Sequence, residues 1–137
     1  MSELFKAITA KDANLLKQLL DSGKDANTKE NETLILRAGS SLAPYEIFEV
    51  LISHGADVNY ANDVTALLYS TYHPAAFEVI KLLIDSGADV NHSNKRTPLH
   101  NSCLNSNKLE VIKLLVNSKS DVNARERVIL NTQILSF

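Results

Sequence analysis

Residues 78–91 read EVIKLLIDSGADVN, and close copies of this string recur along the chain. The copies are NLLKQLLDSGKDAN (14–27), EIFEVLISHGADVN (46–59) and EVIKLLVNSKSDVN (110–123). The aspartates near the ends of the four strings stand 32 residues apart, at Asp25, Asp57, Asp89 and Asp121. A fixed period of this length is typical of proteins built from stacked supersecondary units. The sequence therefore predicts repeats of one structural unit.

The apolar spacing within each string predicts a helix. In the last copy the apolar residues recur at three- and four-residue intervals, as Leu109, Val111, Ile112, Leu114 and Leu115. This spacing indicates the buried face of an amphipathic helix. Gly55 and Gly87 follow two of these helices, at the position where glycine ends a helix because it adopts positive φ without a Cβ clash.

A second recurring segment, which begins with threonine, precedes each of the last three copies. The segments TLILRA (33–38), TALLYS (65–70) and TPLHNS (97–102) each begin 24 residues before the aspartate of their repeat. Thr97 can cap free amides of a first helical turn, and Pro98 suits the first helical position because its missing N–H would be unpaired there. Each unit is therefore expected to hold a short helix followed by a longer one.

These marks resemble those of the ankyrin-repeat family. Thr97, Pro98, Leu99 and His100 match its TPLH helix start, and residues 87–91 match its GADVN segment. The resemblance covers nearly the whole chain, although Thr33 and Thr65 lack the proline and the histidine, and the loop lengths depart from the family's usual 33-residue unit. It implies an all-α solenoid of stacked helix-turn-helix units with projecting hairpin loops, which form a concave face together with the first helices.

The resemblance also implies one domain over residues 1–137. Its repeats are expected at approximately 1–28, 29–60, 61–92 and 93–124, with a partial fifth unit at 125–137.

Composition excludes several classes of protein. Apolar residues make up 45% of the 137 positions and charged residues 22%, which is typical of a globular chain. The net charge of −2 offers no basic field for nucleic acid or a membrane surface, and no 18-residue apolar run exists to span a bilayer. The first residues lack the apolar core of a signal peptide, and the single Cys103 excludes an intramolecular disulfide. We expect an intracellular, cytoplasmic protein, with nuclear entry possible.

Two histidines and the cysteine raise the question of a metal site. His100 and Cys103 stand at i and i+3 on one predicted helix, and His92 lies in the preceding loop. A closed zinc site needs four ligands, and no second cysteine exists. We favour structural roles: by resemblance His100 hydrogen-bonds within and between repeats, and Cys103 fills space in the helix. His54 is interpreted as a polar or cationic residue near a helix C-terminus.

Catalysis is not expected either. No third group orients a pair of Cys103 and His100, and no glycine-rich phosphate loop exists. The recurring aspartates stand a whole repeat apart and are interpreted as turn formers, whereas the glutamates at the helix starts suit the helix dipole. We predict no catalytic residue, no metal, no cofactor and no small-molecule substrate.

The favoured function is a non-catalytic module that binds another protein, because a solenoid combines a stacked core with a long open surface. Two alternatives stay open: a scaffold within a larger enzyme or channel, and a small inhibitor of an enzyme. A monomer is expected.

The resemblance places binding contacts on the hairpin loops, at 28–32, 60–64 and 92–96, and on the exposed side of each first helix, which includes Ser40, Asn101 and Leu104. The residues favoured for partner binding are Arg37, Tyr60, Tyr69, Tyr72, His73, His92, Lys95 and Arg96. Tyrosine and arginine are enriched where binding energy concentrates. Glu30 and Glu32 are expected to contribute less, and Tyr69 or Tyr72 could instead pack between helices. The resemblance further implies that Asn59, Asn91 and Asn123 could be substrates of an asparaginyl hydroxylase.

Both ends of a solenoid need a cap. Ser2 is expected to cap a first helix with one polar face, and residues 128–137 are expected to cover repeat four partly or to form the stump of a fifth repeat. The apolar residues assigned to this cover are Val128, Ile129, Leu130, Ile134 and Leu135.

The fourth repeat carries Lys119 where the other three carry Gly23, Gly55 and Gly87. A left-handed conformation costs a non-glycine residue about 1 kcal/mol, so Lys119→Gly is expected to stabilise the protein by a similar amount. A denaturant titration measures the change. An unchanged or lower unfolding midpoint would show that Lys119 does not adopt this geometry.

Overall fold

The computed structural model describes residues 2–73, 76–92, 97–104 and 109–118. These residues form helices and loops without extended strands, as expected for an all-α protein. The helices are α1 (Glu3–Thr9), α2 (Ala13–Asp21), α3 (Leu34–Ser40), α4 (Tyr45–Ser53), α5 (Ala66–Ser70), α6 (Phe77–Asp85), α7 (Pro98–Leu104) and α8 (Leu109–Asn117). A shorter odd-numbered helix and a longer even-numbered one thus alternate along the chain.

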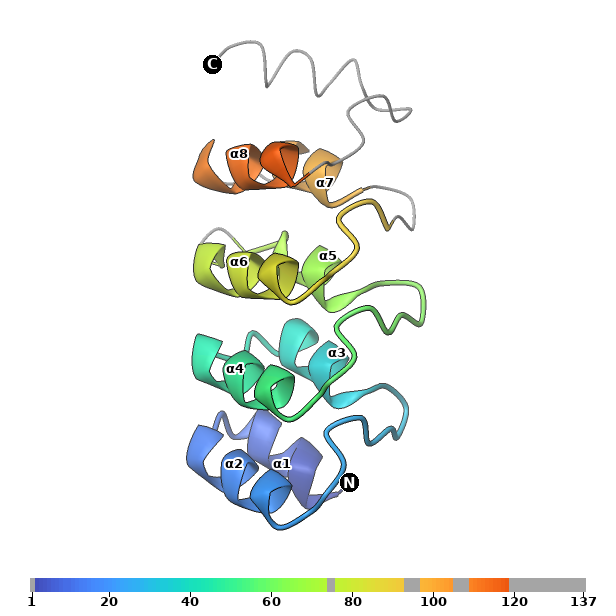
Figure 1. Ribbon diagram of the computed structural model, residues 1–137. Helices are drawn as coiled ribbons and strands as arrows, with labels where there is room; N and C mark the ends of the chain where they lie inside the picture. The colour runs from blue at the N-terminus through green and yellow to red at the C-terminus, as the bar shows by residue number, and fades with distance from the viewer. Residues whose placement is uncertain (1, 74–75, 93–96, 105–108, 119–137) are drawn as a thin grey trace.

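The helix pairs stack in single file (Figure 1). Each odd-numbered helix packs against its own partner and against the odd-numbered helix of the next pair, and the even-numbered helices do the same on the other side. The loops that follow α2, α4 and α6 project together from one edge of the stack. This arrangement confirms the predicted solenoid of helix-turn-helix units.

Hydroxyl side chains cap α1, α5 and α7 at the serine and threonine positions that the sequence marks. Thr65 Oγ1 accepts a hydrogen bond from the Leu68 amide at 3.2 Å, and Thr97 Oγ1 accepts one from the His100 amide at the same distance. Ser2 caps α1 through a long contact of 3.5 Å to the Phe5 amide. Thr33 occupies the matching position before α3 without a side-chain hydrogen bond, so there only the extended backbone marks the helix start.

Glycine ends three of the longer helices in the predicted conformation. Gly23, Gly55 and Gly87 have φ of +104°, +87° and +93°. A side chain at these φ values would meet its own backbone, which explains why glycine recurs there.

One continuous core runs through the stack. The even-numbered helices bury one stripe each, for example Ile47 and Leu51 on α4 and Ile80 and Leu83 on α6. The predicted apolar face of the last helix is wider than the buried stripe, since Leu109 is 38% exposed. Leu109, the first residue of α8, therefore flanks the core rather than filling it.

The aspartates form turns, and the asparagines after them join neighbouring repeats. Asp57 Oδ1 accepts a hydrogen bond from the Asn59 amide at 2.9 Å, and Asp25 and Asp89 do the same two residues before Asn27 and Asn91. This geometry confirms their predicted role in turns.

Asn59 then uses both ends of its side-chain amide on the next repeat. Nδ2 donates to the Gly87 carbonyl at 2.9 Å, and Oδ1 accepts from the Asp89 amide at 2.6 Å. Asn27 makes the equivalent pair with Gly55 and Asp57, at 3.0 and 2.7 Å. These contacts form an asparagine ladder, defined here by Asn27 and Asn59, that fixes the register of one repeat on the next.

Several sequence-based predictions fall outside the described residues. They concern the helix end at Lys119, the turn at Asp121, Asn123 and the cover formed by residues 128–137, and they stay predictions.

We predict that Asn59→Ala destabilises the protein by about 0.5–1.5 kcal/mol, because it removes two exposed inter-repeat hydrogen bonds and water takes over the freed Asp89 amide. Urea unfolding followed by circular dichroism measures the change. Asn31→Ala, at an exposed loop asparagine, is the control and should change the midpoint little. Equal stability of the two variants would show that the ladder does not hold the repeats together.

Candidate functional site

The projecting loops carry the first group of predicted binding residues. Lys29 and Thr33 form an isolated antiparallel bridge, which closes the first loop into a hairpin. The Lys29 ammonium lies 5.1 Å from the centre of the Tyr60 ring, on the next loop. His92 Nε2 lies 3.4 Å from the carbonyl oxygen of Asp63, so each loop contacts its predecessor. The loops therefore form one surface along the edge of the stack.

Arg37 is less available than the sequence suggested. Its Nε lies 2.7 Å from Glu32 Oε1, and its guanidinium lies 5.8 Å from the centre of the Phe5 ring. The expected acidic contributor Glu32 therefore neutralises Arg37 locally. Glu30 Oε1 likewise accepts a hydrogen bond from the Ser2 amide at 2.6 Å, and this bond, the largest cause, lowers the pKa of Glu30.

The two tyrosines of α5 and its C-terminal turn have different surroundings. Tyr69 is half-buried, and its Cβ lies 3.1 Å from the position that a Cβ on Gly39 would occupy. The absence of a side chain on Gly39 thus lets α3 and α5 approach closely, and Tyr69 packs in that contact. Tyr72 is 49% exposed and available to a partner.

The expectation that Asn101 faces a partner is wrong. Asn101 is fully buried, and its Nδ2 donates to Thr71 Oγ1 at 2.7 Å. The sequence pattern missed this contact because Thr71 stands 30 residues away in the preceding repeat. Leu104 and Ser40 are exposed, as expected for that face.

The three residues considered as metal ligands lie in the stack or in a loop and do not gather around one point. His100 and Cys103 are each 5% exposed inside the stack, and His92 lies in a loop. In the ranges that the structure covers, no three His, Cys, Asp or Glu side chains gather as a metal site. Burial raises the pKa of the Cys103 thiol, so little of the nucleophilic thiolate exists at neutral pH. Lys95 and Arg96 lie outside the described residues.

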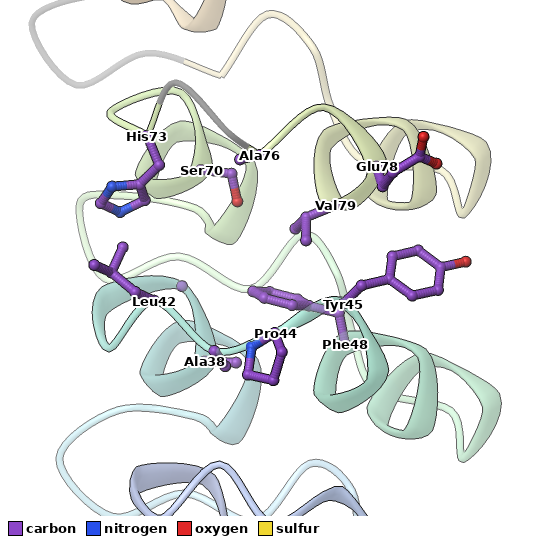
Figure 2. Close-up of a pocket in the computed structure, with 12 residues that line it drawn as sticks. Ala38, Leu42, Pro44, Tyr45, Phe48, Ser70, His73, Ala76, Glu78 and Val79 are labelled. Carbon is purple, nitrogen blue, oxygen red and sulfur yellow. The ribbon is translucent and has the colours of Figure 1, made fainter.

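A pocket opens at the turns between paired helices (Figure 2), a feature that the sequence did not reveal. Its volume is about 530 Å³, and its walls come from the α3–α4 turn and the α5–α6 region. Leu42, Pro44, Phe48 and Val79 supply much of the apolar lining. Figure 2 shows Leu42 and His73 at one end of this pocket and Tyr45 and Glu78 at the other.

The corresponding turn between repeats one and two holds a space of similar size, about 520 Å³. Its lining is more polar, because Lys11, Asp12, Asn14 and Glu46 contribute to it beside Ala10, Ala13 and Pro44. Of these two pockets, the one between repeats two and three is therefore the more apolar.

Comparison with protein families identifies the architecture. The family model described as ankyrin repeats (3 copies) matches residues 4–94 and 42–126. The chain belongs to the ankyrin-repeat family. Ankyrin repeats are generally protein–protein interaction modules. No protein among the curated sequences matches the chain. Of the helices described, none is long and apolar enough to cross a membrane.

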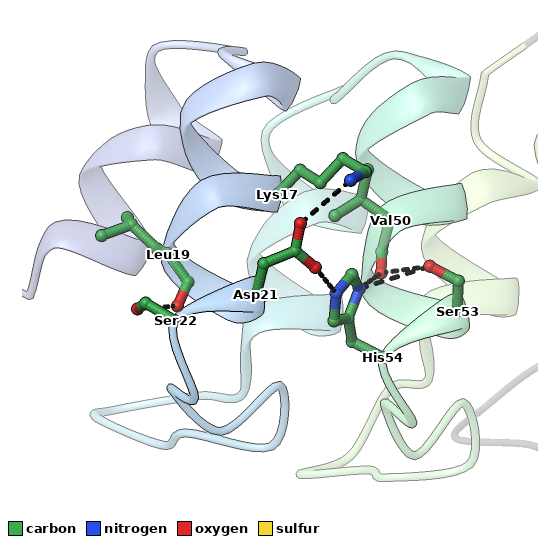
Figure 3. Close-up of polar contacts among 7 residues, drawn as sticks. All are labelled: Lys17, Leu19, Asp21, Ser22, Val50, Ser53 and His54. Atoms are coloured by element: carbon green, nitrogen blue, oxygen red, sulfur yellow. Dashed lines mark hydrogen bonds and ion pairs between the residues drawn. The ribbon is translucent and has the colours of Figure 1, made fainter.

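His54 joins the first two ankyrin repeats through a hydrogen bond to Asp21 (Figure 3). Its Nε2 lies 2.7 Å from Asp21 Oδ1, at the end of α2, and its Nδ1 lies 2.8 Å from the Val50 carbonyl oxygen. Both ring nitrogens face oxygen acceptors, so the doubly protonated imidazolium suits the site best. The hydrogen bond to Asp21 is the largest cause of the raised pKa of His54, and the carbonyl of Val50 adds to it. This geometry agrees with the predicted cationic residue at a helix C-terminus.

The His54–Asp21 pair predicts a pH dependence of stability. Because the folded pKa of His54 is raised above its ordinary 6.5, the contribution is fully present below 6.5 and is lost as pH rises through the folded pKa. We expect Asp21→Asn to lower the unfolding temperature more at about pH 5.5 than at about pH 8.5.

Asp85→Asn is the matched control. Asp85 pairs with Lys81 at 2.8 Å, just as Asp21 pairs with Lys17 at 2.9 Å, so this variant removes the same lysine contact without a histidine. The control should show no such difference between the two pH values. A pH-independent effect of Asp21→Asn would contradict the role of His54.

Proposed function

We propose that this protein is a non-catalytic interaction module that binds a partner protein through its hairpin loops and the concave face lined by α1, α3, α5 and α7. The observation that carries the proposal is the alignment of neighbouring loops by the inter-repeat hydrogen bonds of the asparagine ladder. A surface held in one conformation loses little entropy on binding, which favours affinity.

The aromatic residues supply the expected anchors. Tyr72 is half-exposed beside His73 at the end of α5, and the ring of Tyr60 lies on the loop edge under the Lys29 ammonium. Burial lowers the pKa of His73 because it disfavours the charged imidazolium, and this suits an apolar contact. Tyr69 contributes mainly by supporting α5 against Gly39. The proposed surface also includes His92 and Arg37, whose charge is balanced by Glu32, and Lys95 and Arg96 stay predicted members of it.

Two other roles use the same surface. The chain could be the ankyrin scaffold of a larger enzyme or channel, or a small ankyrin inhibitor whose partner is an enzyme. In both cases the repeats bind protein, and only the partner's activity differs. We further propose a monomer in the reducing cytoplasm, a location supported by the buried, unpaired thiol of Cys103.

We predict that Tyr60→Ala and Tyr72→Ala each weaken partner binding by about 1 kcal/mol or more while the fold stays intact. The partner would be isolated by affinity capture, purified and titrated by calorimetry. Lys113→Ala, on the exposed side of α8, is the control on the opposite helical layer. Loss of binding in this control, together with normal binding by both tyrosine variants, would contradict the proposed face.

A further inference from the structure

The pocket at the turns of repeats two and three is a second surface, separate from the projecting loops. It lies where α3 passes into α4 and α5 precedes α6, so its walls come from the helix-pair turns and not from the hairpin loops. A volume of about 530 Å³ falls within the range of sites that hold a small ligand or a large side chain.

Leu42 marks one end of the pocket. It has φ of +60°, in the left-handed region that is uncommon for a residue other than glycine, and 52% of its surface is exposed. The turn of the first repeat contains Lys11 in the same left-handed conformation, at φ +57°. A polar residue therefore fits this kind of turn, and folding does not require an exposed leucine beside the pocket.

The other end of the pocket is acidic. Glu78 lines it at the start of α6 and is exposed, and Glu49 is exposed on the neighbouring helix α4. Desolvation and the nearby carboxylates of Glu49 and Glu78 raise the pKa of Tyr45, which places negative charge beside its hydroxyl. Lys81 is the nearby cation, and it already pairs with Asp85 at 2.8 Å. An occupant that reaches this end therefore gains from carrying positive charge.

We propose that this pocket binds a basic peptide segment of a partner protein, with one large apolar side chain over Phe48 and a flanking arginine or lysine directed toward Glu78 and Glu49. A polypeptide complements both the apolar end and the acidic end of the pocket, because it can carry an apolar and a cationic side chain at a fixed separation. A second copy of this chain is a poorer complement, since its own net charge is −2. The two sites share His73, which lines this pocket, whereas the hairpin loops take no part in it.

The test uses a capped heptapeptide with a central phenylalanine flanked by two arginines. Titration of the ¹⁵N-labelled protein is expected to shift the amide signals of Gly39, Leu42 and Val79, all at the pocket. Peptides with central serine, or with glutamates in place of the arginines, should bind about tenfold more weakly or not at all.

Two variants and their matched controls test the residues. Leu42→Gln removes the apolar end, and Glu78→Lys reverses the acidic end; each is expected to weaken binding of the arginine peptide about tenfold. Leu15→Gln changes a leucine of similar exposure on α2, and Glu110→Lys changes the glutamate in the equivalent place on α8, so both should leave binding unchanged. Thermal unfolding of every variant establishes that it is folded.

Several results would overturn the proposal. They are no shifts at the pocket, equal binding of the glutamate peptide, or equal losses in the variants and their controls. Concentration-dependent dimerisation abolished by Leu42→Gln would assign the pocket to a second copy instead. Tyr60→Ala separates this site from the proposed loop surface, because it should leave peptide binding unchanged whether or not it affects the natural partner.

Discussion

The length of the helices is the constraint on which the whole structure depends. The longest described helix in each pair has nine residues, which is too short to be stable alone in water. Each pair must therefore bury its apolar stripe against the next pair, and stability accumulates along the stack. The core is continuous for this reason, running from Leu4 and Phe5 in α1 to Leu115 in α8.

Stacking by helices alone leaves the relative position of two pairs poorly specified, and polar contacts supply the specificity. Asn27 and Asn59 each span two repeats with directional hydrogen bonds. His54 and Asp21 make another cross-repeat contact on the even-numbered layer, and Asn101 makes one to Thr71 inside the stack. A loop surface suited to binding follows from these contacts, because neighbouring loops cannot slide past one another.

The same architecture leaves two edges free for recognition. One edge carries the hairpin loops, where Tyr60 and Lys29 meet, and the other carries the turns inside each helix pair. Repeats can differ at the exposed positions of these turns with little cost to the core. Lys11 in the first repeat and Leu42 in the second illustrate this freedom, as they share a backbone conformation and differ in chemistry.

The period of 32 residues, the helix starts at Thr65 and Thr97 and the glycine ends at Gly55 and Gly87 were all readable from the sequence. These features depend on local backbone geometry, which residue type and spacing report directly. The turn role of Asp57 and the position of His54 at a helix end belong to the same class. The side-chain contacts between repeats could not be predicted from the sequence, because a partner about one repeat away does not affect the local spacing of residues. Tertiary structure alone decided that Asn101 is buried against Thr71, that Tyr69 packs beside Gly39, and that Asp21 meets His54. It also created the pocket between Leu42 and Val79, whose walls come from two repeats and exist only when the two are stacked.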